Sequence, residues 1–274
     1  MPAFGTISPD KLMRLIGLPN APTLIDVRME EDFAADPRLL PASQRRSHKN
    51  AADWCDKLGD GPFVVICQKG LKLSHGVAAW LRQAGCDAEV LEGGFEAWHK
   101  AGLPVIPLGE IAPRDGRGRS VWVTRARPKI DRIACPWLIR RFIDPDAVFL
   151  FVAPSEVEAV ADRFGGVPFD VDGVRWSHRG EFCTFDVMVE AFGLGFEAMS
   201  RLAVIVRGAD TARPDLAPEV SGLLAASLGF SRMYADDLEQ MAATFPLYDA
   251  LYRWCRDATD ETHNWPHKKP GAKA

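Results

Sequence analysis

Short apolar runs alternate with amphipathic segments over the first hundred residues of the chain. The runs centre on Ile25, 64–66 and 90–91, and residues 73–81 place apolar and polar side chains at helical spacing. Alternation of strand-like and helix-like segments is typical of α/β proteins. The pattern over residues 5–108 therefore predicts a mostly parallel, doubly wound sheet with helices on both faces.

The pattern changes in the second half of the chain. Strands are expected at 121–124 and 147–152, with a helix starting at Pro136 and ending near Phe142. Residues 167–171 and 174–177 flank an Asp-Gly pair, which is a hairpin signal. Helical spacing then dominates, and the expected helices cover 155–164, 185–192, 196–207, 217–228 and 235–256. These segments predict an α+β domain that is mostly helical after residue 184.

Segment composition predicts how the 274 residues divide. Residues 109–119 are rich in Gly, Pro and charged side chains, as linkers are. We therefore expect one domain over 1–108, a linker over 109–119 and a second domain over 120–257. The remaining segment, 258–274, carries Pro, Lys, Gly and His and is predicted to be disordered.

Overall composition is that of a soluble globular protein, with 47% hydrophobic residues and a net charge of −4. No leader-like pattern opens the sequence, and no apolar stretch is long enough to span a bilayer. The six cysteines contain no Cys-x-x-Cys pair and are expected to be reduced thiols. We therefore expect a cytoplasmic protein that does not enter membranes.

Cys67 ends the apolar run 63–66 and begins a six-residue loop, 67–72, before the predicted helix. A helix N-terminus and inward-pointing loop amides favour an anion, and here they would favour the thiolate form of the cysteine. Lys69 and Lys72 add positive charge, and Gly70 allows the backbone to curl. The alternative is an ordinary buried thiol at a strand end.

Two more segments join this loop in one pattern: Asp26-x-Arg28, which ends a predicted strand, and the Leu-x-Gly-Gly-x-x-x-Trp segment 91–98. Over about residues 5–108 the chain resembles the rhodanese (sulfurtransferase) family. The resemblance implies a persulfide on Cys67, a cradle of loop residues around it, and structural support from Asp26 and Arg28. The expected site residues in the loop are Gln68, Lys69, Gly70, Leu71 and Lys72.

Two features refine this resemblance. Many family members carry His-Ile-x-Gly-Ala before the cysteine, whereas this chain has Leu-Leu-Pro-Ala-Ser at 39–43. Cysteine phosphatases place an arginine six residues after the nucleophile to bind a tetrahedral oxyanion, and this chain has Leu73 there. A tight loop without that arginine favours sulfur transfer over phosphate chemistry.

The second domain resembles the C-terminal domain of the ChrB chromate-resistance family over about 120–257. The similarity is carried by segments 122–144, 177–186, 206–210 and 248–252. It implies a role in chromate resistance or chromate sensing.

Polar residues able to bind metal fall at the ends of apolar segments in this domain. His178 follows a predicted strand and Asp210 follows a helix, and we expect them to share a pocket with Asp131 and Cys183. Imidazole, carboxylate and thiolate groups together suit Fe, Mn or Zn. The alternative is a hydrogen-bonded histidine beside a buried thiol.

A basic block precedes these residues, with nine Lys and Arg between Arg114 and Arg141. Arg125, Lys129 and Arg132 are candidates for binding an oxyanion such as chromate. The alternative is a solvated charge run paired with Asp131. Nucleic acid is not an expected partner, since the helices after residue 184 are acidic or mixed in charge.

The sequence predicts an enzyme that moves sulfur from a thiosulfate-like donor to a thiol acceptor through Cys67. This chemistry requires no cofactor. The alternative is a chromate-responsive sensor in which Cys67 is only a redox or structural thiol.

Overall fold

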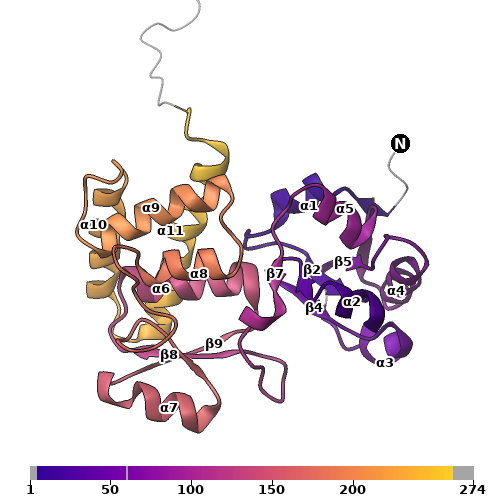
Figure 1. Cartoon of the computed structure of the whole chain (residues 1–274), viewed down its shortest axis with the longest axis horizontal. Helices are drawn as coiled ribbons and strands as arrows, with labels where there is room; N and C mark the ends of the chain where they lie inside the picture. Colours follow the sequence, from indigo (N-terminus) through magenta and orange to yellow (C-terminus); the bar gives the residue numbers. More distant parts are fainter. Residues whose placement is uncertain (1–4, 60, 262–274) are drawn as a thin grey trace, which may run out of the picture.

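The computed structural model describes residues 5–59 and 61–261. Its first part contains a five-stranded sheet in which every neighbouring pair is parallel, in the order β1-β6-β5-β2-β4. The three predicted strands are its three central strands, so the predicted parallel sheet is confirmed (Figure 1). The strands are β1 (Thr6–Ile7), β2 (Thr23–Asp26), β4 (Ser43–Arg45), β5 (Pro62–Ile66) and β6 (Asp87–Leu91).

Helices cover both faces of this sheet, because successive strand residues point to opposite sides. Val64 and Ile66 of β5 belong to the core cluster that includes residues of α1 and α5. Val65 belongs to the other cluster, with residues of α3 and α4. The helices are α1 (Pro9–Leu15), α2 (Glu30–Ala35), α3 (Ala51–Cys55), α4 (Lys72–Gln83) and α5 (Gly94–Lys100), with a 3₁₀ turn at His48–Asn50.

The second part is a three-stranded parallel sheet with order β10-β8-β9 and a group of helices beside it (Figure 1). Its strands are β8 (Val121–Arg125), β9 (Val148–Val152) and β10 (Val167–Pro168). Its helices are α6 (Ile130–Leu138), α7 (Val157–Phe164), α8 (Thr184–Ala191), α9 (Glu197–Asp210), α10 (Val220–Met233) and α11 (Asp237–Asp257). The predicted helical character after residue 184 is confirmed.

Two local predictions for this part are wrong. Residues 167–171 and 174–177 form no hairpin, since β10 pairs with β8 and the bridge from Phe169 to Trp176 is parallel. The helix does not begin at Pro136 either, because α6 already starts at Ile130 and includes this proline. Proline cannot donate the usual helical hydrogen bond, and a π-helical turn, η3 (Ile139–Ile143), follows it directly.

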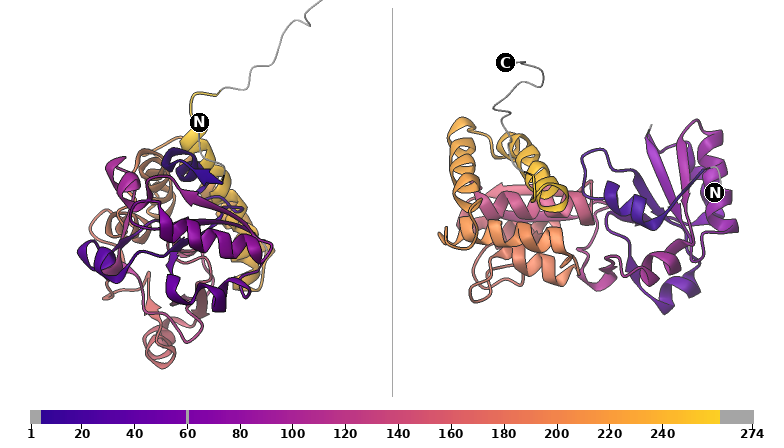
Figure 2. Two further views of the ribbon diagram at one scale, coloured as in Figure 1. Left: turned by 90° about the vertical axis from the view of Figure 1, so that its right-hand side faces the viewer. Right: turned by 90° about the horizontal axis from the view of Figure 1, so that it is seen from above.

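The two parts lie side by side (Figure 2) and share one apolar core. This core joins Leu12 and Trp98 of the first sheet's helices to Phe142 and Tyr252 of the second part. The predicted linker is ordered. It follows β7 (Ile106–Pro107), which pairs with β3 (Arg38–Leu39), and it overlaps the turn η2 (Leu108–Glu110). Arg114 of the linker pairs with Asp144 at 3.2 Å. The segment therefore packs into the second domain and does not act as a free tether.

Among residues 5–59 and 61–261, no helix is both long enough and apolar enough to cross a bilayer. Most of the predicted disordered tail, residues 262–274, lies outside the described residues.

Candidate functional site

Cys67 lies directly after β5, at the carboxyl edge of the five-stranded sheet, and is 4% exposed. Its Sγ accepts the Leu71 N–H at 3.3 Å and lies 3.1 Å from Ser74 Oγ. Ser74 is buried in the first turn of α4, and its hydroxyl also reaches the Leu71 carbonyl at 3.0 Å. A hydroxyl can rotate, so Ser74 can accept from a thiol or donate to a thiolate.

The N-terminus of α5 holds the Cys67 loop from outside. The Phe95 N–H donates to the Cys67 carbonyl at 3.0 Å, and the Glu96 N–H donates to the Gln68 carbonyl at 3.1 Å. These two bonds fix the backbone of the loop whose Leu71 N–H donates to the sulfur. The Leu71 N–H is thus a fixed donor that can stabilise an anionic sulfur.

Glycines make this close backbone contact possible. Gly70 and Gly94 have φ angles of +64° and +61°, which side chains rarely adopt. A Cβ on Gly94 would also overlap the Cys67 and Gln68 carbonyl oxygens, and one on Gly70 would overlap the Leu91 carbonyl. Both positions therefore need glycine for two separate reasons.

Asp26 and Arg28 lie beneath the loop as a buried ion pair. The Arg28 Nε donates to Asp26 Oδ2 at 2.8 Å, and its guanidinium carbon lies 3.8 Å from the centre of the Phe95 ring. Arg28 also donates to the carbonyls of Asp36 and Arg38, at 3.2 and 2.5 Å. The pair thus holds the backbone of residues 36 and 38 and packs against Phe95 of α5, and no recorded contact joins it to Cys67 Sγ.

In the segment 39–43, where the chain departs from the family pattern, one residue has a backbone conformation that favours glycine. Ala42 stands where many family members have glycine, and its φ angle is +57°. Its N–H donates to the Phe142 carbonyl of the second domain at 2.5 Å. Contact with the second domain therefore helps to hold a conformation that alanine alone disfavours.

Charged residues surround the Cys67 edge. Lys69 and Lys72 are exposed, while Gln68 is partly buried and its amide donates to Glu96 at 3.3 Å. A pocket of about 370 Å³ opens at the carboxyl ends of β2 and β4. Its lining is mostly basic: Arg28, Glu30, Arg45, Arg46, Ser47, His48 and Lys49. Arg28 pairs with Asp26 and Arg45 pairs with Glu30, and Arg46 and Lys49 add further positive charge at this edge of the sheet.

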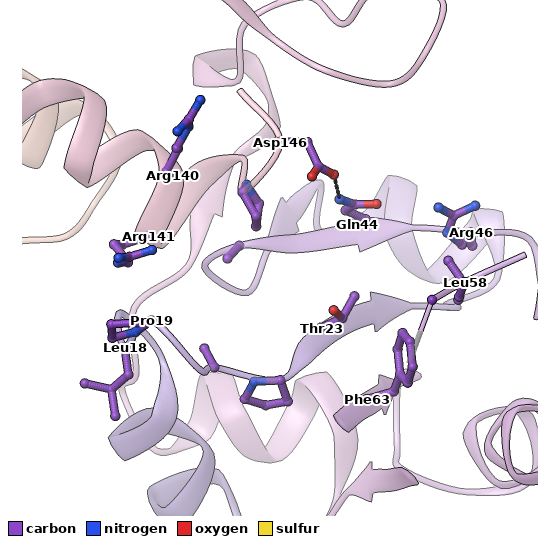
Figure 3. A pocket seen from close by; sticks show the side chains of 15 residues that line it. Leu18, Pro19, Thr23, Gln44, Arg46, Leu58, Phe63, Arg140, Arg141 and Asp146 are labelled. Carbon is purple, nitrogen blue, oxygen red and sulfur yellow. Dashed lines mark hydrogen bonds between the residues drawn. The ribbon is translucent and has the colours of Figure 1, made fainter. Parts of the chain in front are cut away.

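Another cavity, of about 310 Å³, lies between the two domains (Figure 3). It includes Thr23 and Phe63, near the amino ends of β2 and β5, together with Arg140 and Arg141. Cys67 lies beyond the opposite, carboxyl end of β5. This interdomain cavity is therefore separate from the cysteine site.

A second cluster lies in the helical domain, where three carboxylates surround one imidazole. The Nε2 of His178 is 3.2 Å from Asp210, 3.5 Å from Asp131 and 3.5 Å from Asp170. The structure brings together three residues that the sequence placed in one pocket, namely His178, Asp131 and Asp210. Asp170 was missed because the segment 167–171 was interpreted as a hairpin strand, whereas it is the carboxyl end of a parallel strand.

Secondary-structure ends fix these carboxylates. Asp131, in the first turn of α6, accepts the N–H groups of Thr184 and Phe185 at 2.6 and 3.2 Å, at the start of α8. Asp170 follows β10 and accepts the Thr184 hydroxyl at 3.0 Å. Asp210 is the last residue of α9 and accepts the Asp131 N–H at 3.4 Å.

Two groups of predicted site residues make other contacts. Cys183 is fully buried, and its thiol donates to Asp186 at 3.2 Å, while burial raises its pKa, so it is not a ligand in this cluster. Arg125 and Arg132 contact the Asp170 carboxylate at 3.3 and 3.2 Å, and Lys129 is exposed. Arg125 and Arg132 therefore share the single carboxylate of Asp170, while Lys129 makes no recorded contact with it, and the oxyanion site stays a prediction.

Charge is concentrated in the cluster. The hydrogen bond to Asp131 raises the pKa of His178 to about 9, and the charges of Asp131, Asp210 and Asp170 act in the same direction. Burial raises the pKa of Asp210, as do the charges of Asp131 and Asp170. The carboxylates therefore require a positive partner at the position of the imidazole.

The parallel sheet, the strand-end cysteine and the loop that follows it are features of a rhodanese-like fold. A rhodanese-like family model matches residues 8–101, and a model described as ChrB, C-terminal domain matches residues 122–255. The chain is 32% identical to the thiosulfate sulfurtransferase GlpE of Actinobacillus succinogenes over 98% of that protein and 40% of this chain. The chain therefore belongs to the rhodanese family and carries a ChrB C-terminal domain as its second part.

Two further similarities each cover only part of this chain. Protein ChrB of Cupriavidus metallidurans is 35% identical over 55% of this chain, which spans 46% of that protein's length. A solved rhodanese-related structure from Thermoplasma volcanium is 24% identical, with a TM-score of 0.33, and covers 38% of this chain and 98% of its own.

Proposed function

We propose that the first domain is a sulfurtransferase that carries sulfur as a persulfide on Cys67. The contact of Leu71 N–H with Cys67 Sγ, at 3.3 Å, is the observation that carries this proposal. Amides facing a strand-end sulfur stabilise a thiolate before reaction and a persulfide anion after it. Similarity to thiosulfate sulfurtransferases supports the same chemistry.

The reaction would proceed in two displacements. The Cys67 thiolate attacks the outer sulfur of thiosulfate, a new S–S bond forms, and sulfite leaves with the electrons of the broken bond. An acceptor thiolate then attacks the outer sulfur of the persulfide and regenerates the Cys67 thiolate. Lys69 and Lys72, with the basic pocket, would attract the dianionic donor.

We propose that the second domain links this chemistry to chromate resistance, since it is similar to part of ChrB. The six cysteines are free thiols, which fits a reducing cytoplasmic compartment. The shared core supports a joint role, because changes in one domain can reach the other through packed side chains.

Replacement of Cys67 tests the proposal. Cys67→Ser should abolish sulfur transfer from thiosulfate to cyanide, because a serine hydroxyl is not ionised at neutral pH. Cys86→Ser is the matched control, since Cys86 is a half-buried thiol of the same domain away from the loop. Mass spectrometry after thiosulfate treatment should show one added sulfur atom in the control and none in the Cys67 variant.

Equal turnover by the Cys67 variant would refute the assignment. A wild-type protein that gains no sulfur and shows no turnover would instead favour the chromate-responsive sensor, in which Cys67 need not form a persulfide.

A further inference from the structure

We propose that His178, Asp131, Asp170 and Asp210 bind one divalent transition-metal ion, of the Mn²⁺ or Fe²⁺ class. The site lies in the second domain, where the carboxyl end of β10, the start of α6 and the end of α9 converge. It makes no use of Cys67, so the proposal stands apart from the sulfur-transfer function.

The spacing of the donor atoms is that of a coordination shell. Nε2 of His178 lies 3.2 to 3.5 Å from one oxygen of each aspartate, and one donor atom each from Asp131, Asp170 and His178 lie within 4.8 Å of one another. Metal bonds of about 2.0–2.2 Å at angles between right angles and tetrahedral angles separate neighbouring ligand atoms by about 2.8–3.6 Å. Asp131, Asp170 and His178 therefore form the core of the site, and Asp210 faces the same nitrogen of His178 at 3.2 Å.

The hydrogen bond to Asp131 accounts for only one of the three contacts between His178 and the aspartates. An imidazole carries a single N–H at Nε2, and direct N–H donors to carboxylates prefer about 2.7–2.9 Å. Here three carboxylates face that one nitrogen, all at longer distances. A divalent cation at this point would accept a lone pair from every one of the four groups.

The surroundings hold the ligands in place without an ion. Asp131 is 1% exposed and its oxygens accept two backbone N–H groups, while Asp170 is 6% exposed and is held by Thr184, Arg125 and Arg132. The His178 side chain is 42% exposed, which leaves a route for an ion and water. Such supporting contacts orient ligands and increase metal affinity.

The donor set selects the class of ion. Three of the four donors are carboxylates, which suit Mn²⁺ and other hard ions, and the imidazole adds affinity for Fe²⁺ and later metals. The thiol of Cys183 donates to Asp186 and adds no soft ligand. We therefore expect Mn²⁺ or Fe²⁺ in preference to Cu or a thiolate-bound zinc.

Mn²⁺ titration of the full chain, freed of metal with a chelator, tests the site. Electron paramagnetic resonance of free Mn²⁺ should show one ion bound per chain. His178→Ala and Asp210→Asn should each weaken binding about ten-fold or more, since loss of a direct ligand should at least match loss of a supporting contact. The control is Asp162→Asn, which removes one exposed negative charge from the same domain and should leave Mn²⁺ binding unaltered.

Thermal unfolding followed by circular dichroism provides a second readout. Mn²⁺ should raise the midpoint of wild type and Asp162→Asn, and raise it less in the His178 and Asp210 variants. Absence of stoichiometric Mn²⁺ binding to wild type would overturn the proposal and leave His178 as a hydrogen-bonded imidazolium only. Equal affinity in all four proteins would overturn it as well. Persulfide formation on Cys67 is measured in the same samples, so failure of either function is seen separately.

Discussion

Substitution of Gly94 by alanine tests whether the contact between α5 and the Cys67 loop builds the sulfur site. Gly94 has a φ angle of +61°, and a Cβ there would overlap the carbonyl oxygens of Cys67 and Gln68. Gly102 has a φ angle of +67° but nothing within 4 Å of such a Cβ. Gly102→Ala therefore reproduces the backbone strain without the close approach.

The magnitude follows from the contacts at risk. The left-handed conformation costs alanine about 1–2 kcal/mol at either position. Separation of α5 from the loop would also weaken two hydrogen bonds, Phe95 N–H to Cys67 and Glu96 N–H to Gln68, each worth about 0.5–1.5 kcal/mol. We expect Gly102→Ala to lose about 1–2 kcal/mol of unfolding free energy, and Gly94→Ala about 2–5 kcal/mol.

Catalysis should separate the two variants more sharply. Displacement of a reacting atom by about 1 Å can cost roughly a hundred-fold in rate. Gly94→Ala should therefore lower kcat/KM for thiosulfate about ten- to hundred-fold, while Gly102→Ala keeps wild-type kcat/KM. Urea unfolding and the thiosulfate–cyanide assay give both quantities. The same stability and activity for the two variants would refute the role assigned to this contact.

Two further predictions concern charge. Lys69→Ala combined with Lys72→Ala should raise the KM for thiosulfate several-fold at low ionic strength and less at high salt, because salt screens exposed charges. The control is Lys57→Ala, which removes an exposed positive charge before β5. A change in KM that does not depend on salt would contradict the role of these lysines in attracting the donor. The Asp115 carboxylate accepts hydrogen bonds from the Arg119 side chain and backbone, which lower its pKa from 3.8 to about 2. The stabilising effect of the Asp115 carboxylate should therefore be present above about pH 4 and be lost as the pH falls through 2. A ¹³C titration of the Asp115 carboxyl group with a midpoint near 3.8 would show that its hydrogen bonds with Arg119 do not form.

Residues close together in the sequence determined the sulfur site. The apolar run before Cys67, the short loop and the following helix are contiguous, so local backbone preferences were enough to place the cysteine at a strand end. The same holds for the parallel sheet, whose central strands appear as apolar runs. Ser74 was missed because its contact with Cys67 Sγ depends on the rotation of α4, not on a residue pattern.

The aspartate–histidine cluster depended on tertiary structure. The sequence indicated His178 and Asp210 from their positions at element ends and added Asp131 to their pocket, but it assigned Asp170 to a hairpin. An Asp-Gly pair favours a tight turn locally, yet the pairing of β10 with β8 outweighed it and placed Asp170 at the carboxyl edge of a parallel sheet. Likewise, the basic residues Arg125 and Arg132 were visible in the sequence, but only the fold showed that they share the carboxylate of Asp170.

Local sequence thus determined elements whose geometry is set by neighbouring residues, namely strands, helices and the cysteine loop. Long-range packing decided which charged groups meet, as in the contact between Asp131 and Asp210, 79 residues apart. It also decided that the two domains share a core, because apolar faces are buried against whichever complementary surface the fold brings to them. The physical reason is that backbone preferences act over a few residues, whereas burial and charge pairing act through space.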